Sequence, residues 1–194
     1  VIWSLAGSAR LAWMGWVGVA LAAVGTLLMT VSPFGADAKP YLNNYIPVLE
    51  QPLFFAGLVV AGAGFALAIV RALLVIPGAA AANASGGDTA DAAALRVGAW
   101  LAAVAGACAF LGFAVSWLGV PDAEGQARWE MVFWGGGHAL QFQHALLAVV
   151  AWFWLAGALG ARMAVGARAQ VVLFILAAAP LVFVPLIYAY WDVG

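Results

Sequence analysis

Charged residues are scarce in this chain. Of its 194 residues, seven are lysine or arginine and eight are aspartate or glutamate, whereas 67% are hydrophobic. A soluble domain typically carries roughly 25% charged residues, so we expect lipid to be the main solvent of this chain. The net charge of −1 provides no basic surface for nucleic acid, and we expect no nucleic-acid partner.

Cysteine is almost absent as well. Cys108 stands alone in an apolar run, which excludes an intrachain disulfide and a CxxC metal or redox motif. The chain begins at Val1 and no basic n-region with a cleavage site precedes it. We therefore expect a processed N-terminus, or a longer chain of which these residues are a part.

Long apolar runs, in contrast, are plentiful. A membrane-spanning helix needs about 20 mainly apolar residues. Five segments qualify, namely 11–31, 52–76, 94–120, 131–160 and 169–190. Between the second and the third, PGAAAANASGGDTADAA (77–93) is of low complexity and is predicted to be a cytoplasmic loop. The prediction is an all-α fold: a polytopic membrane helix bundle with five transmembrane helices, forming a single domain over 1–194.

The few basic residues predict the orientation of the bundle. With five spans, one side carries Arg10, Arg71, Arg96, Arg162 and Arg168, and the other carries Lys39 and Arg128. Basic residues favour the cytoplasmic side, so we expect a cytoplasmic N-terminus and a periplasmic C-terminus in a bacterial inner membrane. No charge is predicted deep within a span, which argues against a transport function, because ion pathways usually contain intramembrane charges.

Polar side chains are concentrated in one apolar helix. The stretch FWGGGHALQFQH (133–144) holds both histidines of the chain, His138 and His144, together with two glutamines. Helical geometry puts Gln141 about 60° from His138, on one stripe, and His144 about 120° round and ~9 Å further along. We therefore expect the two histidines not to share a metal ion.

The glycines that precede His138 leave space beside the backbone. Residues 135–137 are all glycine, and a run without side chains lets a large group approach the helix. That group is either a neighbouring helix in close contact or a flat macrocycle such as haem. The sequence leaves both readings open.

The pattern FW-x-x-G-H, formed by Phe133, Trp134, Gly137 and His138, resembles the sixth helix of the catalytic subunit of haem–copper oxidases. This family includes cytochrome c oxidases and nitric oxide reductases. The resemblance implies haem and copper cofactors, with His138 as a metal ligand and Trp134, Gly137 and Gln141 lining the cofactor site. It further implies an oxidoreductase that reduces O2 or NO, supplied with electrons by a cytochrome c or a quinol.

The sequence also departs from the family. Where the family often continues with Pro, Glu and Tyr, this chain has Ala139, Leu140 and Phe142, and its last helix ends in YAYWDVG without a histidine pair. Stable copper sites need three or four ligands. The alternative hypothesis is a non-catalytic accessory or assembly subunit of a respiratory or photosynthetic complex, in which His138 only bonds a neighbouring helix. Both hypotheses place the chain in the lipid bilayer beside other subunits.

Overall fold

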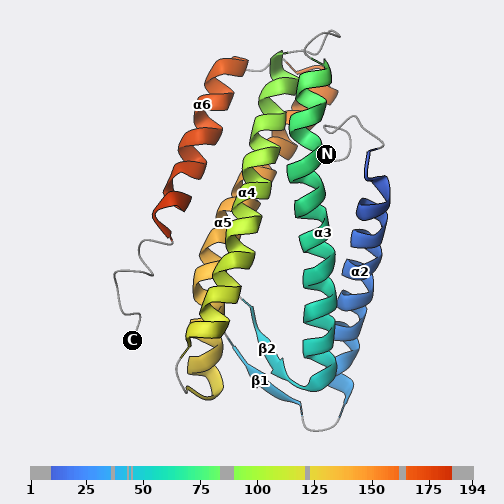
Figure 1. Ribbon diagram of the computed structural model, residues 1–194, viewed down its shortest axis with the longest axis vertical. Coiled ribbons are helices and arrows are strands. Elements are labelled where there is room, and N and C mark those ends of the chain that lie inside the picture. The colour runs from blue at the N-terminus through green and yellow to red at the C-terminus, as the bar shows by residue number, and fades with distance from the viewer. Residues whose placement is uncertain are drawn as a thin grey trace.

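The computed structural model describes residues 10–35, 38–42, 44, 46–83, 90–120, 123–161 and 165–184. These ranges form α2 (Ala12–Val31), η1 (Ser32–Phe34), β1 (Lys39–Tyr41), β2 (Val48–Glu50), α3 (Pro52–Asn83), α4 (Ala90–Gly119), α5 (Gly125–Ala158), α6 (Ala167–Ala178) and η2 (Ala179–Val182). The helices run alongside one another, with the two short strands at one end (Figure 1). The predicted all-α bundle is confirmed.

Four helices are long and apolar enough to cross a membrane: Ala12–Phe34, Pro52–Gly78, Ala90–Gly119 and Gly125–Ala158. The fifth predicted span, 169–190, begins as the shorter apolar helix Ala167–Val182. Its α-helical part stops at Ala178 and a 3-10 turn follows, because Pro180 has no N–H to donate to the carbonyl oxygen four residues earlier. Residues 185–190 of that prediction lie outside the described ranges.

The prediction of a loop over 77–93 was wrong for its described residues. Helix α3 continues to Asn83 and α4 starts at Ala90, so only 84–89 remain outside the description. Alanine has the highest helix propensity of all residues. The alanines after Pro77 therefore help to offset the loss of the backbone hydrogen bond that this proline cannot donate. Helix α5 likewise starts at Gly125, before the predicted 131. Its first turns are polar, and an apolar-run criterion therefore did not include them.

The connection between α2 and α3 contains an unpredicted β-hairpin. Strands β1 and β2 pair antiparallel, with Lys39 opposite Glu50 and Tyr41 opposite Val48. The hairpin is tied to the start of α5 by the Gln126 side chain, whose Nε2 donates to the carbonyl oxygen of Leu42 at 2.8 Å. The hairpin therefore covers one end of the bundle, against α5.

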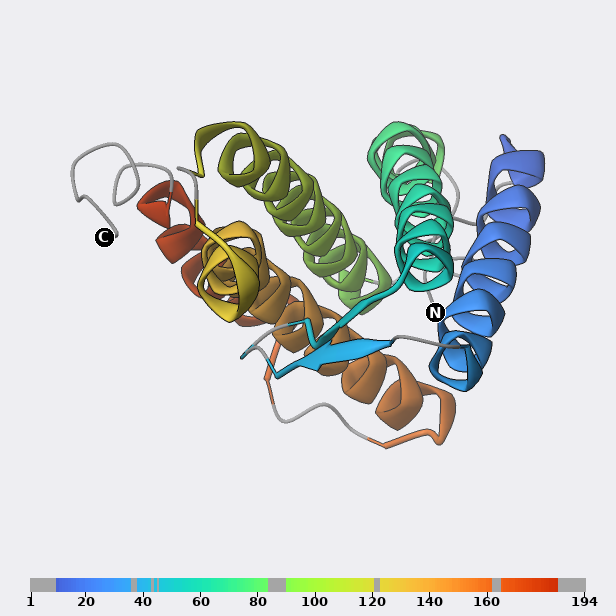
Figure 2. The ribbon, with the colours of Figure 1, turned by 90° about the horizontal axis from the view of Figure 1, so that it is seen from below.

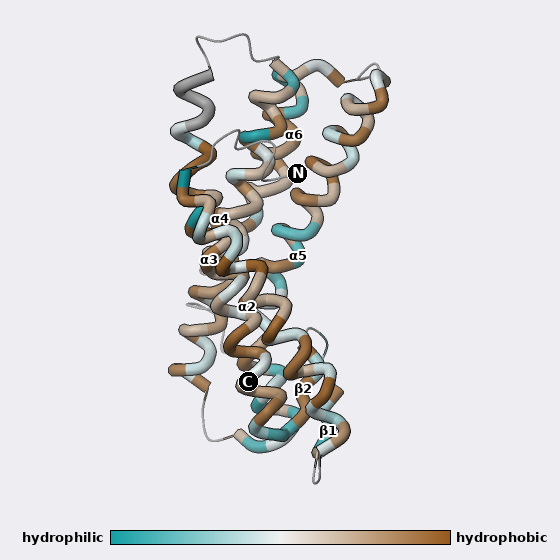
Figure 3. Tube along the Cα trace, turned by 90° about the vertical axis from the view of Figure 1, so that its right-hand side faces the viewer, coloured by the Kyte–Doolittle hydropathy of each residue, from teal (hydrophilic) through white to brown (hydrophobic). Residues whose placement is uncertain are grey.

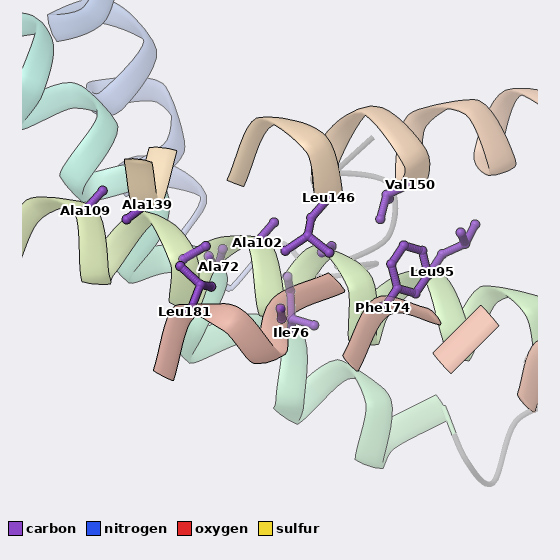
Figure 4. Close-up of a cluster of buried hydrophobic side chains, with 14 residues drawn as sticks. Ala72, Ile76, Leu95, Ala102, Ala109, Ala139, Leu146, Val150, Phe174 and Leu181 are labelled. Carbon is purple, nitrogen blue, oxygen red and sulfur yellow. The ribbon is translucent and has the colours of Figure 1, made fainter. Parts of the chain in front are cut away.

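Helix α4 lies at the centre of the bundle and is packed through small residues. It contacts α3, α5 and α6, whereas α2 packs against α3 (Figure 2). Alanines form its buried face, where Ala99, Ala102, Ala105 and Ala109 are fully buried. Leu146 and Val150 of α5 lie around this face with Phe174 of α6 (Figure 4). Hydrophobic colours cover most of the bundle in Figure 3, and large apolar side chains such as Trp16 and Leu27 are exposed, as expected for a lipid-facing surface.

Candidate functional site

His138 is held against the backbone and the ring of Trp134, one turn earlier in α5. Its Nδ1 lies 2.7 Å from the carbonyl oxygen of Trp134, and the two ring centroids are 4.2 Å apart at an interplanar angle of 59°. A carbonyl oxygen only accepts hydrogen bonds, so Nδ1 must carry the proton. Nε2 is then the nitrogen whose lone pair can accept a hydrogen bond or bind a metal.

Helix α5 is continuous through the predicted site residues, so His138 and Gln141 share the stripe that helical spacing assigned to them. Trp134 and His138 are half-buried and Gln141 is exposed, whereas Gly137 is buried between them. The buried stripe of α5 includes Val132, Gly136 and Gln143, and Gly136 lies about 200° round the helix from His138. The stripe of Trp134, His138 and Gln141 is therefore directed away from α4.

The space beside Gly136 is used for helix packing. A Cβ atom on Gly136 would collide with the ring of Phe113, and a Cβ atom on Gly112 would lie 3.1 Å from the Cα of Gly136. The backbones of α4 and α5 therefore meet closely at Gly112 and Gly136. At Gly136 the group that fills the space is therefore the neighbouring helix α4, and this space lies on the opposite face of α5 from His138.

Sequence reasoning missed Gln143 as a packing residue. Gln143 is only 9% exposed, and a Cβ atom on Gly106 of α4 would lie 2.7 Å from its Nε2. The signal was present, because Gln143 follows Gly136 by seven residues and so lies on the same stripe. Gln141, which the resemblance placed at the cofactor, is the exposed glutamine of the two.

His138 is the metal ligand that the resemblance implies. Within the ranges described, no group of three or more His, Cys, Asp or Glu side chains converges. His144 is exposed and lies on another face of α5, as predicted. Because a copper site needs three or four ligands, a copper ion held by His138 would need further ligands from beyond this group of residues.

A small apolar pocket lies beside Gly135, the first glycine of the run. It has a volume of about 160 Å³ and lies between α4, α5 and η2. Its lining comprises Cys108, Leu111, Gly112, Val115, Ser116, Gly135, Leu181 and Val184. A pocket of this size and polarity suits a small apolar molecule or a lipid methyl end.

Comparison of the chain with protein-family models, with curated proteins and with solved structures finds no match in any of the three. By the length and hydropathy of its helices, the chain is a multi-pass membrane protein.

Proposed function

We propose that the chain is a membrane subunit, or part of one, resembling the catalytic subunit of haem–copper oxidases, and that it takes part in reducing O2 or NO. The observation that carries this proposal is the 2.7 Å contact between Nδ1 of His138 and the Trp134 carbonyl oxygen. Metal-ligating histidines usually donate their other ring N–H to a carbonyl or carboxylate, which sets the ring orientation and the tautomer. His138 would supply one imidazole, and the other ligands would come from outside the described residues or from another subunit.

The exposure of the stripe supports the same proposal. Gln141 is exposed and His138 half-buried on a face directed away from α4. Polar side chains that face hydrocarbon are costly, and in membrane proteins they usually face a partner or a functional site. A cofactor held by a neighbouring subunit or segment would cover this stripe.

The orientation belongs to the proposal as well. Arg71 contacts the start of α2, whereas Lys39 and Arg128 line the hairpin end. Under the positive-inside rule the hairpin end would face the periplasm of a bacterial inner membrane. An electron donor, a cytochrome c or a quinol, would then dock from that side or from the bilayer.

The test is a comparison of the two histidines of α5. The chain is purified in its native complex, and its haem and copper content and absorption spectrum are measured for the wild type, His138→Ala and His144→Ala. We expect His138→Ala to lose cofactor or to shift the spectrum while the bundle still assembles, and His144→Ala to behave as wild type. A native complex without haem or copper, or equal spectra for both variants, would overturn the proposal.

A second candidate is a non-catalytic accessory or assembly subunit. The close contact of Gly112 and Gly136 beside Phe113 favours it, because helix packing then explains Gly136 without a cofactor. In that case the cofactor content of the complex would be independent of His138. Deletion of the chain would reduce the amount of assembled complex, but not the spectrum of the complex that remains.

A further inference from the structure

A pocket open to water lies between the β-hairpin and the start of α5. It has a volume of about 820 Å³. Its lining comprises Lys39, Tyr41, Glu50, Ala123, Glu124, Gly125, Arg128 and Trp129. The lining thus contains two cations and two carboxylates, so its formal charges cancel. A pocket of this composition suits a ligand that carries both signs of charge.

Aromatic rings and strand pairing hold these charged groups in place. The Tyr41 hydroxyl donates to Oε2 of Glu50 at 3.0 Å, and Nζ of Lys39 lies 5.2 Å from the centroid of the Tyr41 ring. Cζ of Arg128 lies 5.4 Å from the Trp117 ring centroid. A cation that contacts the face of an aromatic ring still has N–H groups that point away from the ring. These N–H groups can donate hydrogen bonds to an anionic ligand.

Lys39 is positively charged at physiological pH. Its pKa is raised above the ordinary value, first by interaction with the Tyr41 side chain and then by the Glu50 and Glu124 carboxylates. Since the ordinary value is already 10.5, the lysine keeps its proton near neutrality. Lys39 is therefore charged whenever a ligand is present.

The pocket lies where the apolar helices end. Trp117 and Trp129 have ring centroids 6.3 Å apart, and tryptophan is enriched at the level of lipid headgroups. Beside them Leu118 is 85% exposed, next to the end of α4 at Gly119. Lipid headgroups and the first part of their acyl chains meet a membrane protein at this level.

We propose that this pocket binds the headgroup of a zwitterionic phospholipid with a primary ammonium, such as phosphatidylethanolamine. The phosphate would accept hydrogen bonds from Lys39 and Arg128, and the ammonium would donate to Glu50 and Glu124. A primary ammonium has N–H groups for these carboxylates, which a choline lacks, and an uncharged glycerol headgroup would leave the carboxylates without a counter-charge. This proposal is independent of the redox function.

The experiment measures lipid retention by native mass spectrometry. The detergent-purified protein is titrated with phosphatidylethanolamine, phosphatidylglycerol and phosphatidylcholine that carry the same acyl chains. We expect phosphatidylethanolamine to bind most tightly. Arg128→Gln should weaken its binding about tenfold, as expected when one charge-assisted hydrogen bond is lost. Glu50→Gln should weaken phosphatidylethanolamine binding but not phosphatidylglycerol binding.

Arg168→Gln is the matched control, because Arg168 is an exposed arginine near the start of α6, outside the pocket. Circular dichroism checks that each variant is folded. Equal binding of the three lipids, or an equal loss for Arg128→Gln and Arg168→Gln, would overturn the proposal. Displacement of the lipid by an equal concentration of glycerophosphoethanolamine would also overturn it, because the ligand would then be a soluble zwitterion.

Discussion

Gly25 of α2 and Gly57 of α3 face each other across the contact between these helices. A Cβ atom on Gly25 would lie 2.5 Å from the carbonyl oxygen of Gly57, and one on Gly57 would lie 2.7 Å from that of Gly25. Seven residues along each helix, in opposite directions, Gly18 and Gly64 repeat the arrangement at 3.0 and 2.5 Å. Small residues let membrane helices approach closely and gain packing energy that lipid does not provide. These two glycine pairs hold α2 to the bundle.

A methyl group at Gly25 should separate α2 from α3. We expect Gly25→Ala to lower the free energy of unfolding in micelles by about 1–3 kcal/mol, the range for overpacked sites. Gly62→Ala is the control, since its Cβ would meet only a Phe110 ring carbon at 3.8 Å. Equal stability of the two variants in thermal or denaturant unfolding would contradict this prediction.

The crossing of α4 and α5 can be tested with a double-mutant cycle. Gly136→Ala should be destabilising by about 1–3 kcal/mol because the new methyl group would strike the Phe113 ring. In a Phe113→Ala background, Gly136→Ala should lower the free energy of unfolding much less, because the ring that the methyl group would strike is absent. The coupling between the two sites, measured by unfolding of the four proteins, should therefore be clearly non-zero. Additive effects would show that Gly136 does not accommodate the ring.

Arg71 fastens the start of α2 to α3. It is 3% exposed, and its Nε and Nη2 donate to the carbonyl oxygens of Leu11 and Arg10 at 3.1 and 3.4 Å. Leu11 has a left-handed backbone, with φ of 54°. Arg71→Met should lower the free energy of unfolding by about 1.5–3 kcal/mol, the usual contribution of a hydrogen bond from a charged group. Arg168→Met, at an exposed position, should leave the unfolding midpoint within error of wild type.

A buried amide connects α6 to α4. Gln170 is fully buried, and its Nε2 donates to Oδ1 of Asp91 at 3.0 Å and to the carbonyl oxygen of Val165 at 2.9 Å. Gln170→Glu would place a second carboxylate beside Asp91, so we expect destabilisation at pH 7 that diminishes as the pH falls. Protonation of one carboxyl removes the repulsion and restores a donor. Gln170→Leu should instead lose stability equally at all pH values, as unfolding at pH 5 and pH 7 would show.

The proposed orientation can be measured by cysteine labelling. In a Cys108→Ser background, which removes the exposed native thiol, a membrane-impermeant maleimide should label Glu124→Cys in intact cells. Ala82→Cys should react only after the cells are permeabilised. The reverse pattern would place the hairpin end in the cytoplasm and the predicted topology would be wrong.

Periodicity within a single helix was readable from the sequence. The apolar runs predicted the four long helices, and the 3.6-residue repeat placed His138 and Gln141 on one stripe, with His144 elsewhere. Element ends were harder to predict, because alanine-rich and polar turns next to a span are compatible with both loop and helix. The extension of α3 to Asn83 and the hairpin at Lys39–Glu50 are therefore structural findings.

The sequence by itself determined that the chain is an apolar, all-α bundle and that its histidines lie on separate faces, because composition and helical repeat are properties of the chain alone. Only the tertiary structure decided what the glycines contact. In a lipid-facing helix almost every side is apolar, so hydropathy does not distinguish the face toward α4 from the face toward lipid. That choice depended on which backbones could approach each other: Gly136 packs under Phe113, and His138 is directed to the opposite side.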